Sequence, residues 1–187
     1  MSLEKVSKED KSYGETGSMS MELLFGEIDY DIAEDVCRWI LNCNFAQNKP
    51  NILNLIINSP GGDMTSAFAI IDVMASSMIP IRTIGLGAIQ SAGLMIFLAG
   101  TKGERIITPN TGILSHQYSF GAGGKHHELV ATHKEYGLTF DKQLTHYKKT
   151  TGLSEKHIKK FLLPAEDVYL SADEAVEYGI ADRVALI

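Results

Sequence analysis

The sequence predicts an α/β fold, because short apolar strands and amphipathic helices alternate along most of its 187 residues. The apolar run "NILNLIIN" (51–58), bounded by proline and glycine, predicts a buried strand. The next segment, 63–77, carries apolar residues at helical spacing, and the same strand–turn–helix order recurs at 79–99. Repeated units of this kind are typical of proteins with a parallel sheet.

The remaining elements follow from the same patterns. In the first half the sequence predicts a strand and turn at 22–28, a helix at 29–43, a strand at 51–58, a helix at 63–77, a strand at 79–87 and a helix at 91–99. In the second half it predicts two strands within 103–117, a glycine-rich loop at 120–125, a long polar helix at 126–149, a short helix at 154–162, a strand at 168–171, a helix at 172–178 and a strand at 181–187. The polar residues 1–20 predict a flexible N-terminal arm before a single domain at 21–187.

Composition excludes several classes of protein. The chain has 17 basic and 23 acidic residues, a net charge of −6, which argues against nucleic-acid binding. It has no run of about 18 apolar residues, so we expect no membrane span. The N-terminus lacks the apolar core of a secretory signal, and Cys37 and Cys43 are too few and badly spaced for a disulfide framework. We therefore expect a cytoplasmic protein with reduced cysteines.

Ser91 is the first candidate catalytic residue. It lies in "GLGAIQSAGLMIFLAG" (85–100), where a predicted strand gives way to a predicted helix. Amide N–H groups in the first turn of a helix have no intrahelical partner, so they could stabilise an oxyanion formed by attack of Ser91 on a carbonyl. The alternative is that Ser91 only caps the helix, as serine often does. The hydrolase pattern G-x-S-x-G is incomplete, because Ile89 stands where its first glycine belongs.

The motif "NSPGGD" (58–63) is the second candidate. Its glycines allow close approach of the backbone to a ligand and leave N–H groups free to donate. The amide of Gly62 could therefore form an oxyanion hole together with the amide of Ala92. A tight turn without a catalytic role is the alternative for this motif.

His116 and Asp167 complete a possible triad. His116 ends a predicted strand, whereas the other five histidines lie on predicted polar helices, where we expect them on solvated faces. A zinc motif starting at His127 fails, because position 131 is alanine, and we expect no metal site. A serine, an imidazole base and a carboxylate that orients the base form a hydrolytic triad. Asp167 could supply the carboxylate, although spacing alone does not distinguish it from Asp63, Asp72, Asp173 and Asp182.

Together these motifs resemble the ClpP family of self-compartmentalised serine peptidases. The resemblance covers most of the chain and rests on four blocks in order: "INSPGG" (57–62), "GAIQSAG" (87–93), "AGTKGERIITPNTGILSHQ" (99–117) and "DVYLSADEAVEYGIAD" (167–182). It implies Ser91 as nucleophile, His116 as base and Asp167 as orienting acid. It also implies that the amides of Gly62 and Ala92 form the oxyanion hole.

The chain departs from the family pattern at several places. Ala92 stands where methionine is usual, and Tyr118 stands where the family continues His-Gln-Pro. The stretch between residues 152 and 167 is two residues longer than the common pattern, and the N-terminal arm is also divergent. The family arm lines an axial pore and meets the unfoldase.

The resemblance also implies a fold and an assembly. The fold would be a ClpP/crotonase-like spiral of ββα units with a protruding handle at about 118–150. The assembly would be a homo-oligomer, a double heptameric ring that degrades unfolded polypeptides delivered by an AAA+ Clp unfoldase. ATP would be used by that partner, since this chain has no phosphate-loop motif and needs no cofactor of its own. The alternatives are a crotonase-type acyl-CoA enzyme and a catalytically weak structural subunit of a ring.

Overall fold

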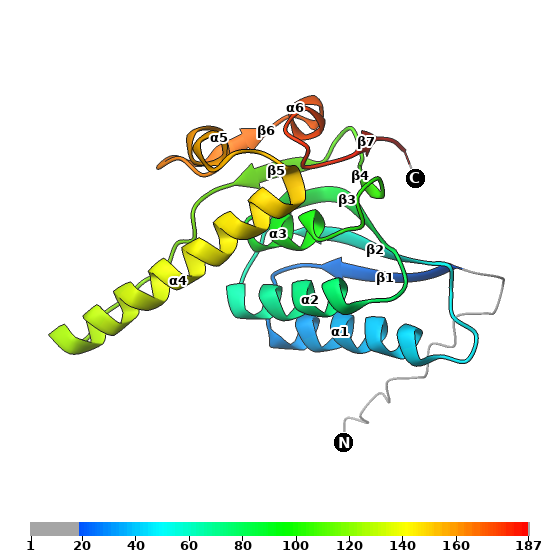
Figure 1. Cartoon of the computed structure of the whole chain (residues 1–187), viewed down its shortest axis with the longest axis horizontal. Helices are drawn as coiled ribbons and strands as arrows, with labels where there is room; N and C mark the ends of the chain where they lie inside the picture. The colour runs from blue at the N-terminus through cyan, green and yellow to red at the C-terminus, as the bar shows by residue number, and fades with distance from the viewer. Residues whose placement is uncertain (1–18, 187) are drawn as a thin grey trace, which may run out of the picture.

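Seven strands form one sheet in the computed structural model of the chain, which describes residues 19–186 (Figure 1). The strands are β1 (Met19–Phe25), β2 (Ile52–Ser59), β3 (Ile81–Gln90), β4 (Arg105–Ile107), β5 (Gly112–Ser115), β6 (Val168–Leu170) and β7 (Arg183–Val184). The helices are α1 (Tyr30–Phe45), α2 (Met64–Ser76), α3 (Ala92–Leu98), α4 (His126–Thr151), α5 (Glu155–Phe161) and α6 (Ala172–Glu177). This alternation confirms the predicted α/β class.

Two strands are longer than the sequence predicts. β1 begins at Met19 because it pairs in parallel with β2 along its whole length. β3 continues to Gln90, three residues past the predicted end at 87, because its last residues pair with β5. The predicted arm at 1–20 lies outside the described residues, except for Met19 and Ser20, which begin β1.

The sheet is parallel apart from one pair of strands. Its order is β1-β2-β3-β4-β7, while β5 pairs with β3 and, in antiparallel fashion, with β6. The register between β2 and β3 shifts, since Ile57 lies opposite Gly85 whereas Ser59 lies opposite Ile89. Irregularities of this kind are common beside active sites. This one divides β3 into a first half that pairs with β4 and a second half that pairs with β5 and leads to Ser91.

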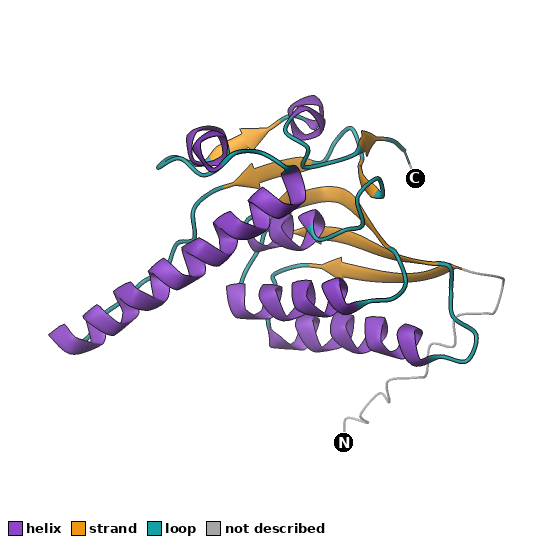
Figure 2. Cartoon of the chain, viewed as in Figure 1, coloured by secondary structure: helices purple, strands orange, loops and turns teal. Residues whose placement is uncertain are grey.

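The strands predicted within 103–117 are therefore present, but they do not pair with each other. β4 and β5 each extend the sheet from a different half of β3. The main core lies between the sheet and the helices α1, α2 and α3 (Figure 2). The helix α3 is buried along its whole length. A smaller apolar cluster of Ile56, Ile84 and Ile106 covers part of the opposite face. Within residues 19–186 no helix is both long and apolar enough to cross a membrane.

α4 is the protruding handle helix that the sequence predicts. Its N-terminal half extends away from the sheet, while its C-terminal half packs beside α3 (Figure 1). The buried residues of α4 all belong to the C-terminal half, beginning at Thr139. The sequence of this helix carries a thin apolar stripe of Leu129, Val130, Tyr136, Phe140 and Leu144. Leu129 and Val130 are 41% and 57% exposed. The stripe is thus covered only where α4 meets the rest of the chain.

Candidate active site

Ser91 joins β3 to α3 in a backbone conformation that side chains seldom adopt. Its φ of 53° and ψ of −122° make it the only residue other than glycine with positive φ among residues 19–186. Such conformations cost about 1–3 kcal/mol and are concentrated at functional sites. The connection therefore has the strained geometry of a nucleophile elbow, although the first glycine of the usual motif is missing.

The side chain of Ser91 does not cap α3. Ser91 occupies the N-cap position but makes no side-chain hydrogen bond to the first turn of the helix. Its Oγ lies instead 2.7 Å from Nε2 of His116. Both residues are partly accessible, since Ser91 is half-buried and the imidazole of His116 is 21% exposed. The contacts of Ser91 therefore do not support a capping role alone.

The segment that carries His116 is fixed on both sides of the histidine. Backbone carbonyls of residues 162–164 accept hydrogen bonds from Ser115 Oγ at 2.5 Å and from Gln117 Nε2 at 2.9 Å. The hydroxyl of Tyr147, on α4, lies 2.8 Å from Ser115 Oγ. Burial raises the pKa of Tyr147, so this hydroxyl stays protonated. Because the single proton of Ser115 Oγ is donated to the carbonyl of Leu162, the hydroxyl of Tyr147 is the donor to Ser115. The imidazole is therefore held by its neighbours in the chain.

Asp167 approaches the other nitrogen of the same imidazole. Its Oδ1 lies 3.8 Å from Nδ1 of His116, which is longer than a hydrogen bond. The antiparallel pairing of β5 with β6 places Val168 opposite Ser115, and this pairing brings the two side chains together. The carboxylate of Asp167 is 59% exposed. The structure thus joins Ser91 and His116 closely and sets Asp167 beside them without a direct bond.

Two of the competing aspartates have other contacts. Asp63 is the N-cap of α2, where its carboxylate accepts from the amide of Ser66. Asp182 pairs with Arg105, whose side chain is 1% exposed. Burial alone would raise the pKa of Asp182, but hydrogen bonds from Arg105 and Gly103 and the charge of Arg105 hold it well below its usual range. Both aspartates therefore have partners of their own that stabilise the fold.

The glycine loop packs directly against the start of α3. A methyl group on Gly61 would lie 2.6 Å from Cβ of Ser91 and 3.1 Å from the amide nitrogen of Ala92, so no side chain fits there. Gly61 and Gly62 also have positive φ values of 104° and 147°. Within residues 19–186, the amides of Gly62 and Ala92 donate to no protein partner. Two backbone donors are thus available at the loop and at the first turn of α3.

His146 corrects the prediction that the remaining histidines lie on solvated faces. It is half-buried, and its Nε2 donates to the carbonyl of Met95 in α3 at 2.8 Å. Burial lowers the pKa of His146 and the charge of Lys149 lowers it further, while the bond to Met95 opposes them. His157 is also half-buried, with its ring centroid 4.5 Å from that of Phe161.

Neither a metal centre nor a disulfide is found in the part of the chain that the structure describes. No group of three or more histidine, cysteine, aspartate or glutamate side chains in residues 19–186 could hold a metal ion. Cys37 and Cys43 are both free thiols on α1, as expected from their spacing. Burial raises the pKa of Cys37, which keeps its thiol protonated.

Sequence reasoning missed the residues of α4 that contact the site. Gln143, His146 and Tyr147 bond to the segments that carry His116 and Ser91. The one available signal was a polar Gln143 directly beside Leu144 in the apolar stripe of this helix. A polar residue in such a stripe indicates a buried hydrogen bond, but not its partner.

Comparison with known proteins identifies the family. The Clp protease family matches residues 7–186. The chain is 35% identical over 160 residues to ATP-dependent Clp protease proteolytic subunit 2 of Nocardia farcinica, covering 84% of this chain and 76% of the relative. It is 32% identical over 184 residues to proteolytic subunit 1 of Corynebacterium jeikeium, covering 98% and 96% of the two chains. As its four motifs predict, the chain belongs to the Clp protease family.

Proposed function

We propose that the chain is a serine endopeptidase subunit that cleaves unfolded polypeptides to short peptides. The observation that carries this proposal is the 2.7 Å contact between Ser91 Oγ and His116 Nε2. His116 takes the proton of Ser91 as Oγ attacks the peptide carbonyl carbon, and an acyl-enzyme forms. His116 then gives this proton to the leaving amine and later activates the water that releases the acyl group.

The other site residues act on the charges that develop in this reaction. The amides of Gly62 and Ala92 donate to the oxyanion, and their freedom from other partners supports this assignment. Asp167 stabilises the imidazolium that forms when His116 takes the proton. Because its carboxylate is 3.8 Å from Nδ1 and 59% exposed, it acts here through charge more than through a hydrogen bond.

The substrate and the assembly follow from the family. The exposed segment 119–125 contains no strand, so an extended substrate that bound there would pair with irregular backbone rather than with a preformed strand edge. Several relatives are named proteolytic subunits of an ATP-dependent protease, which supports assembly with other subunits. From the resemblance of its motifs to the ClpP family, we propose that the assembly is a cytoplasmic homo-oligomer, a double heptameric ring. Unfolded chains would reach it from an AAA+ Clp unfoldase that uses the ATP.

Replacement of the nucleophile tests the catalytic proposal. Ser91→Ala should lower the cleavage rate of a fluorogenic peptide by about 10³- to 10⁶-fold, with an unchanged circular dichroism spectrum. A serine-directed fluorophosphonate should label the wild-type chain at Ser91 and leave the variant unlabelled. A variant that keeps more than a tenth of the wild-type rate would exclude Ser91 as nucleophile. A wild-type chain that is neither labelled nor active would instead favour the structural-subunit alternative.

A further inference from the structure

The backbone that carries His116 passes beyond both of its strand partners. β5 pairs with β3 up to Leu114 and with β6 up to Ser115, and both ladders end there. The next residues nevertheless keep a hydrogen-bonded edge. The carbonyl of His116 accepts from Gln143 Nε2 at 2.9 Å, and the amide of Tyr118 donates to Gln143 Oε1 at 3.1 Å.

This pair of bonds has the pattern of a β-ladder. In a sheet, one residue of a strand bonds both to a carbonyl and to the amide two residues further along its neighbour. The side-chain amide of Gln143 does the same on either side of Gln117. Gln143 therefore continues the ladder by one step at the position where the imidazole leaves the backbone.

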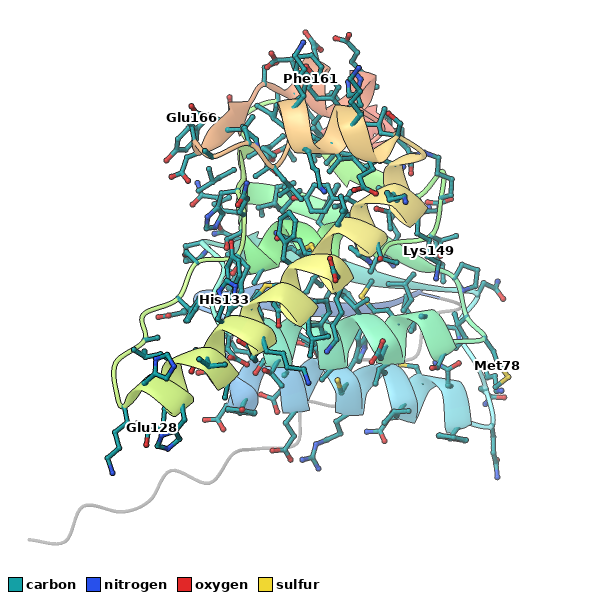
Figure 3. All side chains as sticks on the ribbon, turned by 60° about the vertical axis from the view of Figure 1, so that its left-hand side comes forward. Met78, Glu128, His133, Lys149, Phe161 and Glu166 are labelled. Carbon is teal, nitrogen blue, oxygen red and sulfur yellow. The ribbon has the colours of Figure 1, made fainter. Side chains whose placement is uncertain are left out.

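Gln143 is itself held rigidly. It is 3% exposed and lies in the C-terminal half of α4, which is attached to α3 through His146 and to β5 through Tyr147. Figure 3 places Lys149 near the end of α4 that lies against the rest of the chain, and Glu128 and His133 on the half that projects from it. The bonds to the His116 segment thus come from the anchored part of the helix.

The hydrogen bond to Gln143 Oε1 requires the backbone N–H of Tyr118, which stands where the family pattern has proline. A proline at position 118, as in the family pattern that the motifs resemble, would have no N–H to donate. Tyr118 supplies this donor, and its ring also stacks on Tyr136 of α4 at a centroid distance of 5.8 Å. The segment after His116 is therefore attached to α4 twice.

We propose that Gln143 is a positioning residue that sets the approach of His116 to Ser91. The inference rests on the proposed function, because it assigns a supporting role at the same site. Gln143 touches neither the imidazole nor Ser91 in the structure, so it acts only through the backbone at residues 116–118. Without it, one partly buried carbonyl and one amide lose their partners, and the backbone at 116–118 loses two of the bonds that hold it. A displacement of about 1 Å in a catalytic group costs about 10²-fold in rate.

The test compares Gln143→Leu with a matched control on the same helix. Thr139→Val is the control, because Thr139 is 7% exposed, lies one turn earlier and bonds only to Glu135 of its own helix. Each variant is assayed in the full-length assembly with a peptide amide and with a nitrophenyl ester of the same acyl group. Acylation by the amide needs His116 to accept a proton and then to deliver it to the amine, whereas acylation by the ester needs only the first transfer.

Gln143→Leu should lower kcat for the amide about 10²-fold with KM within about twofold of wild type. Its kcat/KM should fall less for the ester than for the amide, and Thr139→Val should keep both rates. Equal losses for ester and amide, a loss confined to KM, or a Thr139→Val variant as impaired as Gln143→Leu would overturn the proposal.

A second measurement does not depend on hydrolysis. Hydrogen exchange at the Tyr118 amide should be faster in Gln143→Leu than in wild type and unchanged in Thr139→Val. Unchanged exchange in Gln143→Leu would contradict the bridging bond itself. A wild-type chain without hydrolysis that depends on Ser91 would refute the proposed function, while the exchange result would still decide whether Gln143 holds the segment.

Discussion

Replacement of Asp167 by asparagine should reduce activity far less than loss of a bonded triad aspartate. A directly bonded aspartate contributes about 10⁴-fold in the best-studied serine protease. Here the carboxylate lies 3.8 Å from Nδ1 of His116. At about 4 Å, unit charges attract by about 1 kcal/mol in water and about 4 kcal/mol at an effective dielectric constant of about 20.

Because Asp167 is exposed, we expect its attraction to the imidazolium to lie in the lower part of this range of about 1–4 kcal/mol. Its side chain is 59% exposed, so solvent screens the attraction between the carboxylate and the imidazolium of His116. We therefore expect Asp167→Asn to lose about 1–2 kcal/mol of transition-state stabilisation, or about 5- to 30-fold in kcat/KM. Higher ionic strength should reduce the difference in kcat/KM between the variant and wild type, because salt screens the attraction that the variant lacks.

The assay is cleavage of a fluorogenic peptide at several salt concentrations. Asp173→Asn is the control, because Asp173 is also an acidic residue near the C-terminus but lies in the first turn of α6. An unchanged rate in Asp167→Asn would refute the assignment of Asp167 as the acid. A loss of about 10⁴-fold, insensitive to salt, would refute the distance argument and show that the carboxylate bonds to Nδ1 in the working enzyme.

Two predictions concern stability. Asp182→Ala leaves the buried charge of Arg105 without its partner and should lower the free energy of unfolding by about 3–5 kcal/mol in urea titrations. Because the pKa of Asp182 is held below its usual range, the stability that its carboxylate provides is present above about pH 4 and is lost as the pH falls further. The free energy of unfolding of Asp182→Ala should therefore fall less steeply with decreasing pH than that of wild type. His146 has a lowered pKa in the fold, so protonation opposes folding: wild-type stability should fall as the pH drops below about 6.5, and His146→Gln should lessen this fall. For either residue, the assignment would be contradicted if the free energy of unfolding changed with pH at the same slope in wild type and in the variant.

Local signals were sufficient to predict some parts of the site and not others. The strand–helix boundary at Ser91 and the loop at Gly62 are marked by apolar runs and glycines, and the structure has both where the sequence predicts them. Asp167 could not be selected from five aspartates by spacing. Its place depends on the antiparallel pairing of β5 with β6, which the sequence does not encode locally.

The contacts of α4 were beyond sequence reasoning for a similar reason. Gln143 and His146 bond to backbone atoms 27 and 51 residues away, and a carbonyl or amide of any residue type could have served. The length of β3 was also underestimated, because its last residues are a strand only through pairing with β5. Long-range pairing determined each of these features.

The order of the site along the chain has a consequence for its synthesis. Ser91 and His116 leave the ribosome before any of the residues that hold the His116 segment, which are Gln143, Tyr147 and the carbonyls of 162–164. A nascent chain that ends before α4 therefore contains the proposed nucleophile and base without the bonds that align them. If the chain has the proposed activity, peptide cleavage would begin only after the C-terminal third has been made, so an unfinished chain would not cut its neighbours on the ribosome.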